Sequence, residues 1–390
     1  MPIARDEAEL LAWIASRYEP TVQLLADLVN TDSGSFDQEG VDRAGEILRR
    51  HLEARGLPCE IIRHPEASFC LKATVAARET TADCGHVVLL GHRDTVFPKG
   101  TAALRPFRIE GTRAYGPGVA DMKAGLAMNA LVLEAFARFG GASRPLVMLV
   151  TPDEEIASPS SRAVIEATAR GARAVFNAEP GRISGNIVSA RKGAMFLTIE
   201  VTGKAAHSGA AHEQGVSAIE ELCRKVVELH ACTDYATGTT YNVGLIQGGQ
   251  SINTVAPFAS VRLDVRFKTL PAMAAAEADI ERILGRIHLP GTTTTISEKA
   301  AFLPLEANRA NQALSGHYIA CAADLGIGIA GEATGGSADS GFTSAAGAPT
   351  VCGTGPVGEK AHSPDEVCHL DTLIPRAQAL ALAIARLASA

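Results

Sequence analysis

The fold is decided by two neighbouring stretches of sequence, VVLLGHRDTVFPKG (residues 87–100) and PFRIEGTRAYGPGVADMKAG (residues 106–125). The apolar run Val87 to Leu90 stops abruptly at Gly91, which is typical of a strand buried in a parallel sheet. In open α/β sheets, chemical groups gather where such strands reach their carboxyl ends. The residues that follow Gly91 are therefore the first candidates for a functional site.

His92 and Asp94 stand at this strand end, two residues apart and so on the same side of an extended backbone. The imidazole can bind a metal while the carboxylate orients it, although the pair alone is equally compatible with a structural hydrogen bond. After a glycine-rich turn, Asp121 is predicted to open a helix that runs to Phe139 and stops at Gly140. A carboxylate at that position supplies half of a metal site.

Two further apolar runs have the same form. The run at 145–151 leads into Glu154 and Glu155, and the run at 174–176 leads into Glu179. Helical patterns between the runs predict an α/β fold, with a mixed, mostly parallel sheet and helices on both faces. Because parallel strands end at one edge, these three carboxylates are expected to lie beside the His-x-Asp pair.

The pattern changes at about residue 194 and resumes after residue 301. Strands are predicted over 196–201, 241–246, 261–267 and 292–297, and helices over 213–230 and 271–287. This β-α-β-β-α-β order is that of a ferredoxin-like domain. We therefore predict a catalytic domain made of residues 1–193 and 302–390, interrupted by a small domain at 194–301. Its sheet leaves a face and an edge to be covered, so we expect a homodimer through residues 194–301.

Composition limits the classes of protein. A hydrophobic content of 46% and a charged content of 20% are those of a globular protein, and the net charge of −7 argues against nucleic acid and anionic membranes as partners. No apolar run approaches the about 18 residues of a spanning helix. Residues 7–30 are predicted to form one amphipathic helix and do not resemble a signal peptide. The eight cysteines form no C-x-x-C pair, so we expect reduced thiols and a cytoplasmic location.

Two histidines and three carboxylates are the candidate metal ligands: His92, Asp121, Glu155, Glu179 and His362. Oxygen and nitrogen donors without thiolate suit zinc, cobalt or manganese. Five ligands exceed what one catalytic zinc needs, whereas two metals that share Asp121 would use them all. Glu154 lies beside a ligand and is the candidate general base toward an attacking water. These groups together predict a hydrolase of amide or ester bonds.

The chain resembles the di-zinc superfamily of glutamate carboxypeptidases, aminoacylases, acetylornithine deacetylases and succinyl-diaminopimelate desuccinylases, and the bacterial folate-cleaving glutamate carboxypeptidases most of all. The matching motifs span almost the whole chain in the order of that superfamily: GHRDTVF (91–97), YGPGVADMKAG (115–125), TPDEE (151–155), NAEP (177–180), TGKAAHSGAAHEQGVSAI (202–219), INTVAP (252–257), LDVRF (263–267) and AHSPDE (361–366).

The resemblance implies two zinc ions per subunit. One metal would have the ligands His92, Asp121 and Glu179, and the other Asp121, Glu155 and His362. Asp94 would orient the first histidine, Glu154 would be the catalytic base, and the peptide bond before Met122 would be cis.

The resemblance also implies roles in substrate binding. His207 would polarise the scissile carbonyl from the partner subunit, while Asn253 and Arg266 would help to hold the substrate carboxylate. Arg266 has the alternative of pairing with Asp264 or Glu200 on the sheet. The backbone around Gly335 and Gly336 would line the pocket.

Lys299 stands where the glutamate carboxypeptidases have an arginine, and lysine holds a carboxylate less directionally than the guanidinium fork. We expect release of an amino acid with a free carboxylate from a small peptide or an N-acyl precursor. The lysine leaves the identity of the released amino acid open between glutamate and others. The alternatives are an aminoacylase or deacetylase, a peptide-binding relative without catalysis, and a di-metal phosphoesterase. The phosphoesterase is disfavoured because no basic cluster gathers near the ligands.

Overall fold

The run Val87–Leu90 forms part of a strand in the middle of an eight-stranded sheet. The computed structural model describes residues 2–78 and 85–387. In spatial order, the strands are β1 (Cys59–His64), β2 (Ala67–Val75), β6 (Leu146–Thr151), β3 (His86–His92), β7 (Ala172–Asn177), β14 (Thr350–Cys352), β8 (Ile187–Arg191) and β13 (Gly331–Thr334).

The sheet is mixed, as predicted, but its parallel part is confined to the centre. Strands β6, β3, β7 and β14 are parallel to one another. The pairings β1 with β2, β2 with β6, and β14 with β8 are antiparallel. The central strands are buried on both faces, which explains why they read as continuous apolar runs rather than as alternating patterns.

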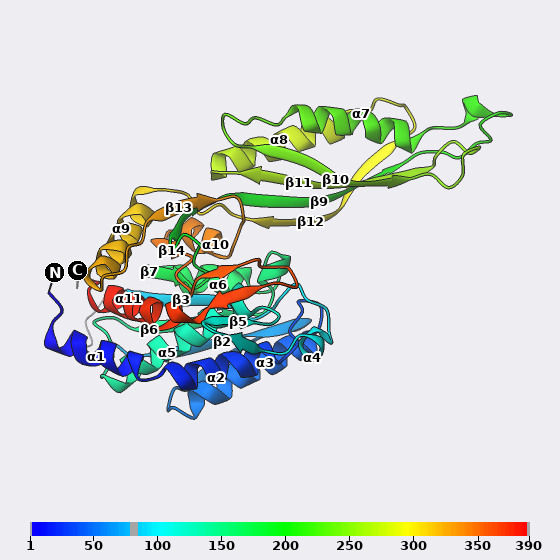
Figure 1. Ribbon diagram of the computed structural model, residues 1–390. Coiled ribbons are helices and arrows are strands. Elements are labelled where there is room, and N and C mark those ends of the chain that lie inside the picture. The colour runs from blue at the N-terminus through cyan, green and yellow to red at the C-terminus, as the bar shows by residue number, and fades with distance from the viewer. Residues whose placement is uncertain (1, 79–84, 388–390) are drawn as a thin grey trace. The chain divides into compact units, whose positions relative to one another are not determined.

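Helices cover both faces of this sheet (Figure 1). One face carries α1 (Arg5–Ala15), α2 (Tyr18–Val29), α3 (Gln38–Glu53), α5 (Ala124–Arg138) and α11 (Leu373–Ala385), and the other carries α6 (Arg162–Ala169) and α10 (Ser340–Ala345). Helix α9 (Arg309–Asp324) packs against α11 and β14. Residues 124–136 of α5 are all buried, because the helix lies between the sheet and other helices.

Two predicted helix boundaries in this part of the chain are wrong. The single helix predicted for 7–30 is broken at Ser16 and Arg17, and Pro20 lies in the first turn of α2, where its missing N–H is not needed. The helix predicted to open at Asp121 begins at Ala124 instead. Asp121 lies in the preceding turn with φ −112° and ψ 92°, which is not a helical conformation. The Asp121–Met122 peptide bond is cis, as the resemblance implied.

A small antiparallel sheet carries the loop with His362. It has the order β15 (Gly358–Glu359), β16 (Val367–His369), β5 (Arg113–Tyr115) and β4 (Arg108–Glu110). Val367 is opposite Tyr115 in the register. The chain that leads from β5 to Asp121 therefore starts beside the end of the His362 loop, although the two segments are distant in sequence.

The ferredoxin-like arrangement predicted for the middle of the chain is confirmed. The elements follow as β9 (Gly193–Thr202), α7 (Ala218–Ala231), β10 (Thr240–Gly248), β11 (Phe258–Phe267), α8 (Leu270–Gly285) and β12 (Thr293–Phe302). The strands form an antiparallel sheet in the order β10-β11-β9-β12. The helix predicted for 213–230 starts only at Ala218, because Ser217 caps it by accepting a hydrogen bond from the Glu220 N–H.

The contacts divide the chain into two units. The first comprises the described residues of 1–190, 306–334 and 339–390, and the second comprises residues 191–305 and 335–338. Each unit has its own buried apolar cluster. Within the described residues, none of the helices combines the length and the apolar character that crossing a membrane requires.

Candidate metal centre

Three parallel strands end side by side at the edge where the candidate ligands lie. In the register of the sheet, His92 of β3 is opposite Thr151 of β6, and Leu90 is opposite Asn177 of β7. The segments that follow β6 and β7 therefore leave the sheet next to His92. Because the three strands end at nearly the same height in the sheet, residues that are far apart in the sequence can form one site.

Two groups of side chains come together there, and Asp121 belongs to both. In the first group, His92 Nε2 lies 3.3 Å from Asp121 Oδ1 and 3.6 Å from Glu179 Oε1. In the second, His362 Nε2 lies 3.3 Å from Asp121 Oδ2 and 3.1 Å from Glu155 Oε2. The carboxylate of Asp121 thus turns one oxygen toward each group, which is the arrangement that a bridging ligand requires.

The donor atoms fit divalent cations. His92 Nε2 and Glu155 Oε1 are buried and have no hydrogen-bond partner among the described residues, whereas buried polar atoms are normally paired. Nitrogen and oxygen donors without sulfur suit zinc, cobalt or manganese. Both groups also gather more carboxylates than histidines, and buried negative charge needs a compensating cation. His362 has φ 63°, a left-handed conformation that is uncommon for a residue with a side chain and concentrates at functional sites.

The electrostatics of the centre follow from burial and crowding. Burial raises the pKa of Glu154 and Glu155. Burial alone would lower the pKa of His92, but Glu154, Asp121 and Asp94 outweigh it and raise that pKa. Hydrogen bonds to Asp121 and Glu155 raise the pKa of His362 to about 10. The shifts of the two histidines reflect the acidic groups around them, and a divalent cation would neutralise that negative charge.

Asp94 holds two parts of the centre in place. Its backbone oxygen accepts a hydrogen bond from His92 Nδ1 at 3.0 Å, which leaves Nε2 to face the other ligands. Its carboxylate accepts the backbone N–H groups of Glu154 at 3.0 Å and Glu155 at 3.1 Å, and the Ser35 hydroxyl at 2.7 Å. The residue predicted to orient the histidine therefore also orients the loop that carries the candidate base.

Glu366 positions Asp121, and sequence reasoning missed it. Its buried carboxylate accepts hydrogen bonds from the N–H groups of Gly118, Ala120 and Asp121, at 2.8 to 2.9 Å. Burial raises the pKa of Glu366 to about 7. The residue lies inside the AHSPDE motif, but no local pattern distinguishes an acid that binds backbone amides from a solvated one.

The other predicted site residues belong to the second unit. There, the loops of His207 and Asn253 run side by side, and Ser208 N–H donates to Asn253 O at 3.0 Å. His207 Nδ1 accepts hydrogen bonds from the N–H groups of Gly209 and Ala210, each at 3.2 Å. The neutral imidazole then carries its proton on Nε2 and presents that N–H as a donor.

Arg266 and Lys299 each have an acidic partner within the second unit. Arg266 makes a two-pronged ion pair with Asp264, at 2.7 and 2.8 Å, which is one of the alternatives left open by the sequence. Lys299 Nζ lies 2.7 Å from Glu277 Oε1.

Gly335 and Gly336 belong to the short stretch 335–338 of the second unit. The guanidinium of Arg191 donates to the backbone oxygen of Gly336 at 3.3 Å and to that of Ser337 at 3.2 Å. The backbone of this stretch is therefore held by an arginine, and its predicted role in lining the substrate pocket stays a prediction.

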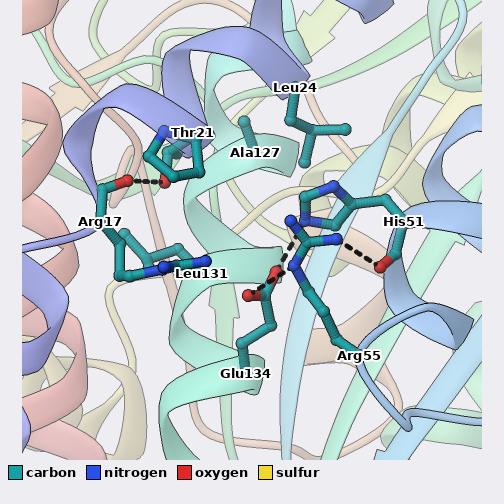
Figure 2. A pocket seen from close by; sticks show the side chains of 9 residues that line it. Arg17, Thr21, Leu24, His51, Arg55, Ala127, Leu131 and Glu134 are labelled. Carbon is teal, nitrogen blue, oxygen red and sulfur yellow. Dashed lines mark hydrogen bonds and ion pairs between the residues drawn. The ribbon is translucent and has the colours of Figure 1, made fainter.

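A second polar cluster lies in a pocket among α2, α3 and α5 (Figure 2). Glu134 contacts His51 Nε2 at 2.7 Å and Arg55 Nε at 2.9 Å, and Arg55 also donates to His51 O. The pocket has a volume of about 10 Å³, which is room for a single water and too small for a substrate. We interpret this cluster as a structural ion pair between α3 and α5.

Comparison with known proteins also points to a metal-dependent hydrolase. Residues 88–386 match the sequence model of Peptidase family M20/M25/M40. The chain belongs to this peptidase family. Carboxypeptidase G2 of Pseudomonas sp. (strain RS-16) is 29% identical over 380 residues, covering 96% of this chain and 91% of the relative. Acetylornithine deacetylase of Proteus mirabilis is 29% identical over 281 residues, covering 66% of this chain and 69% of the relative.

The fold is shared with solved members of the family. Aminopeptidase PepT from Bacillus cereus superposes with a TM-score of 0.71 at 21% sequence identity, covering 94% of this chain and 98% of that one. The predicted resemblance is therefore confirmed: this chain is an enzyme of the family's metallopeptidase and amidohydrolase group.

Proposed function

We propose that this enzyme is a di-zinc amidohydrolase that releases an amino acid with a free carboxylate, in the manner of a glutamate carboxypeptidase. The observation that carries the proposal is the pair of ligand groups that share Asp121, with the buried Glu154 beside them. The similarity to carboxypeptidase G2 over nearly the whole chain supports the carboxypeptidase type. Cobalt or manganese would suit the same donors.

Each of the two groups of side chains would hold one metal ion. His92 and Glu179 would hold one metal, Glu155 and His362 the other, and Asp121 both. When bound, the two cations would lower the pKa of a water molecule and polarise the substrate carbonyl. Asp94 would keep the imidazole of His92 turned toward the centre.

Glu154 is the proposed general base. Its side chain is 8% exposed, and its Oε2 lies 3.8 Å from His92 Nε2. It would take the proton from the attacking water and pass it to the leaving nitrogen. A carboxylate whose pKa is raised by burial suits both steps, because the ideal catalytic pKa lies near the working pH.

The second unit would supply the groups that bind substrate. The Nε2–H of His207 is proposed to donate to the scissile carbonyl oxygen, across the dimer. Asn253, Arg266 and Lys299 would contribute to holding the free carboxylate, with the backbone at 335–336 lining the pocket. Arg266 already donates from Nε and Nη2 to Asp264 and from Nη1 to the Ser337 hydroxyl at 3.3 Å, so only its remaining N–H groups would be available to a substrate.

An aminoacylase or N-acyl amino acid deacetylase is the second candidate. The similarity to acetylornithine deacetylases favours it, as does lysine at position 299 in place of arginine. A peptide-binding relative without catalysis is disfavoured, because such a protein has no need of Glu154. The two candidates differ only in the acyl group and in the amino acid released.

Amino acid release from a panel of N-acyl and dipeptide substrates tests this proposal. The carboxyl-terminal residue should vary among glutamate, aspartate, ornithine, aliphatic and aromatic side chains, with each reaction repeated after chelation and after zinc restoration. We expect zinc-dependent release, strongest for peptide or aromatic acyl glutamate. Preference for a short acyl group would favour the deacetylase. No release of an amino acid from any substrate, by a protein that also binds no metal, would contradict both candidate functions.

We also infer that the protein works as a homodimer in the cytoplasm. Strand β10 lies at the edge of its sheet and exposes Leu245 and Ile246, at 62% and 57%. An apolar edge strand of this kind is a template for pairing with another chain. The seven cysteines in the described residues are free thiols, which suits a reducing compartment.

A mixture of two nearly inactive variants tests the cross-subunit role of His207. The variants His207→Ala and Glu154→Gln are each expected to retain only a small fraction of the wild-type activity alone. After subunit exchange, the mixed dimer holds one site with both groups intact, so part of the wild-type activity should return. Light scattering would verify the dimer. No recovery in a verified mixed dimer, or a fully active monomer, would show that His207 does not act across the interface.

A further inference from the structure

The loop at 152–157 carries both Glu154 and Glu155, and three buried carboxylates hold it: Asp153 within the loop, and Asp94 and Asp339 from outside it. Asp94 binds the backbone N–H groups of the two glutamates. Asp153 accepts hydrogen bonds from Ser160 and Ser161, at the start of α6. The third carboxylate is Asp339, which comes from a distant part of the chain and has no part in the proposed reaction.

Asp339 ties the two ends of this loop together. Thr151, the last residue of β6, donates its hydroxyl to Asp339 Oδ2 at 3.1 Å. Ser158, the first residue after the loop, donates its hydroxyl to Asp339 Oδ1. Asp339 is 2% exposed and both hydroxyl residues are 0% exposed, so bulk water is not available to replace these bonds. One carboxylate thus closes the loop at its base.

The side chain of Asp339 does not cap the helix that follows it, although its position would allow it to. It immediately precedes α10, where an aspartate usually accepts a hydrogen bond from the first turn of the helix. No such bond is present at this helix, and both oxygens turn toward the loop instead. Burying a carboxylate is costly unless its partners are well placed, so the orientation points to the loop as the reason for this residue.

The loop also needs an external restraint. Ala157 and Ser158 have φ values of 70° and 54°, two successive left-handed residues that are not glycine. Such conformations persist only where the surroundings hold them. The Ser158 hydroxyl bond to Asp339 and the Ser158 N–H bond to Asp153 O, at 2.8 Å, provide that restraint.

We propose that Asp339 is a positioning residue for the metal centre: through Thr151 and Ser158 it fixes the loop that presents Glu154 as base and Glu155 as ligand. The proposal rests on the proposed function for the roles of those two glutamates. It assigns Asp339 no contact with substrate. The residue directly follows the stretch 335–338, which belongs to the second unit.

Hydrogen exchange of the metal-free protein tests the positioning directly. In Asp339→Ala, the amides of Glu154 and Glu155 should exchange at least about tenfold faster than in the wild type, a factor that corresponds to about 1.4 kcal/mol. The amide of Asp121, which Glu366 holds, should keep its wild-type rate. Asp339→Asn retains one carbonyl oxygen and is expected to be intermediate.

Metal affinity provides the second readout, measured by chelator competition. Loss of a residue that orients a ligand typically weakens binding by about 10–100-fold. Asp339→Ala should therefore weaken the tight-binding constant of the group with Glu155 and His362, and leave that of the group with His92 and Glu179 close to wild type. In turnover, kcat should fall with little change in KM.

Thr151→Val covers the case in which Asp339→Ala fails to fold, because it removes only one of the two hydroxyl donors. Thr151→Ser should restore wild-type behaviour, since it keeps the hydroxyl. Thr21→Val, which removes a similarly buried hydroxyl in α2, is the matched control and should leave both readouts unchanged.

Wild-type exchange rates at Glu154 and Glu155 in both Asp339→Ala and Thr151→Val would overturn the proposal. An equal loss of metal affinity in both ligand groups, together with a fall in Tm, would show that Asp339 only stabilises the fold. That result would overturn the proposal as well. Failure of the proposed function would look different, as a wild-type enzyme that releases no amino acid. The exchange measurement on metal-free protein decides the positioning role in either case.

Discussion

Glu154→Gln is expected to lower kcat by about 10²–10⁴-fold, the usual contribution of a general base, with both metals still bound. Glutamine keeps the size of the side chain and its backbone N–H bond to Asp94, but it cannot accept a proton. Initial rates on the best substrate of the panel, with metal content measured on the same sample, check this result. Glu66→Gln, an exposed acid in a turn, is the matched control and should be fully active.

The outcome separates the base from the ligands. A Glu154→Gln protein that turns over at nearly the wild-type rate would make the base assignment wrong. A protein that loses its metals would place Glu154 among the ligands instead. Its buried position 3.8 Å from His92 Nε2 places it beside the ligands, so the metal measurement is needed to separate the two roles.

Asp121→Asn is expected to reduce the tightly bound metals from two per chain to at most one and to abolish activity. The two oxygens of Asp121 face different groups, at 3.3 Å from His92 Nε2 and 3.3 Å from His362 Nε2. The asparagine amide offers one neutral oxygen and an NH2 group that can only donate, so it cannot serve two cations. Metal analysis after dialysis checks the count, and Asp6→Asn, an exposed acid of α1, is the control.

Two metals retained by Asp121→Asn at wild-type affinity would contradict the bridging role. Loss of metal from Asp6→Asn as well would show that the loss is a general effect of removing an acidic charge. The comparison must be made on folded samples, because Asp121 also precedes the buried helix α5. A matching Tm for the two variants in metal-free form provides that assurance.

The central sheet and the convergence of ligands could be predicted because they follow from local patterns. Buried parallel strands read as apolar runs, and their ends share an edge, so the residues after Leu90, Thr151 and Phe176 had to be neighbours. The helix break at Ser16 and Arg17 was missed because apolar residues continue at helical spacing on both sides of it. A break of that kind leaves little trace in hydrophobic periodicity.

The residues that support the ligands could not be predicted, because their contacts are long-range. The hydrogen bond between Asp339 and Thr151 joins residues 188 positions apart, and that between Glu366 and Asp121 joins residues 245 positions apart. Both acids stand in loops, where a solvated carboxylate is the ordinary interpretation. Their orientation depends on how the small sheet and α10 pack, and a single sequence does not encode that pairing in any local pattern.

Anomalous X-ray diffraction from zinc-loaded crystals at the zinc absorption edge tests the central claim most directly. The account predicts two peaks per chain, one among His92, Asp121 and Glu179 and the other among Asp121, Glu155 and His362, with the carboxylate of Asp121 between them. A single peak, or two peaks that do not share Asp121, would contradict it.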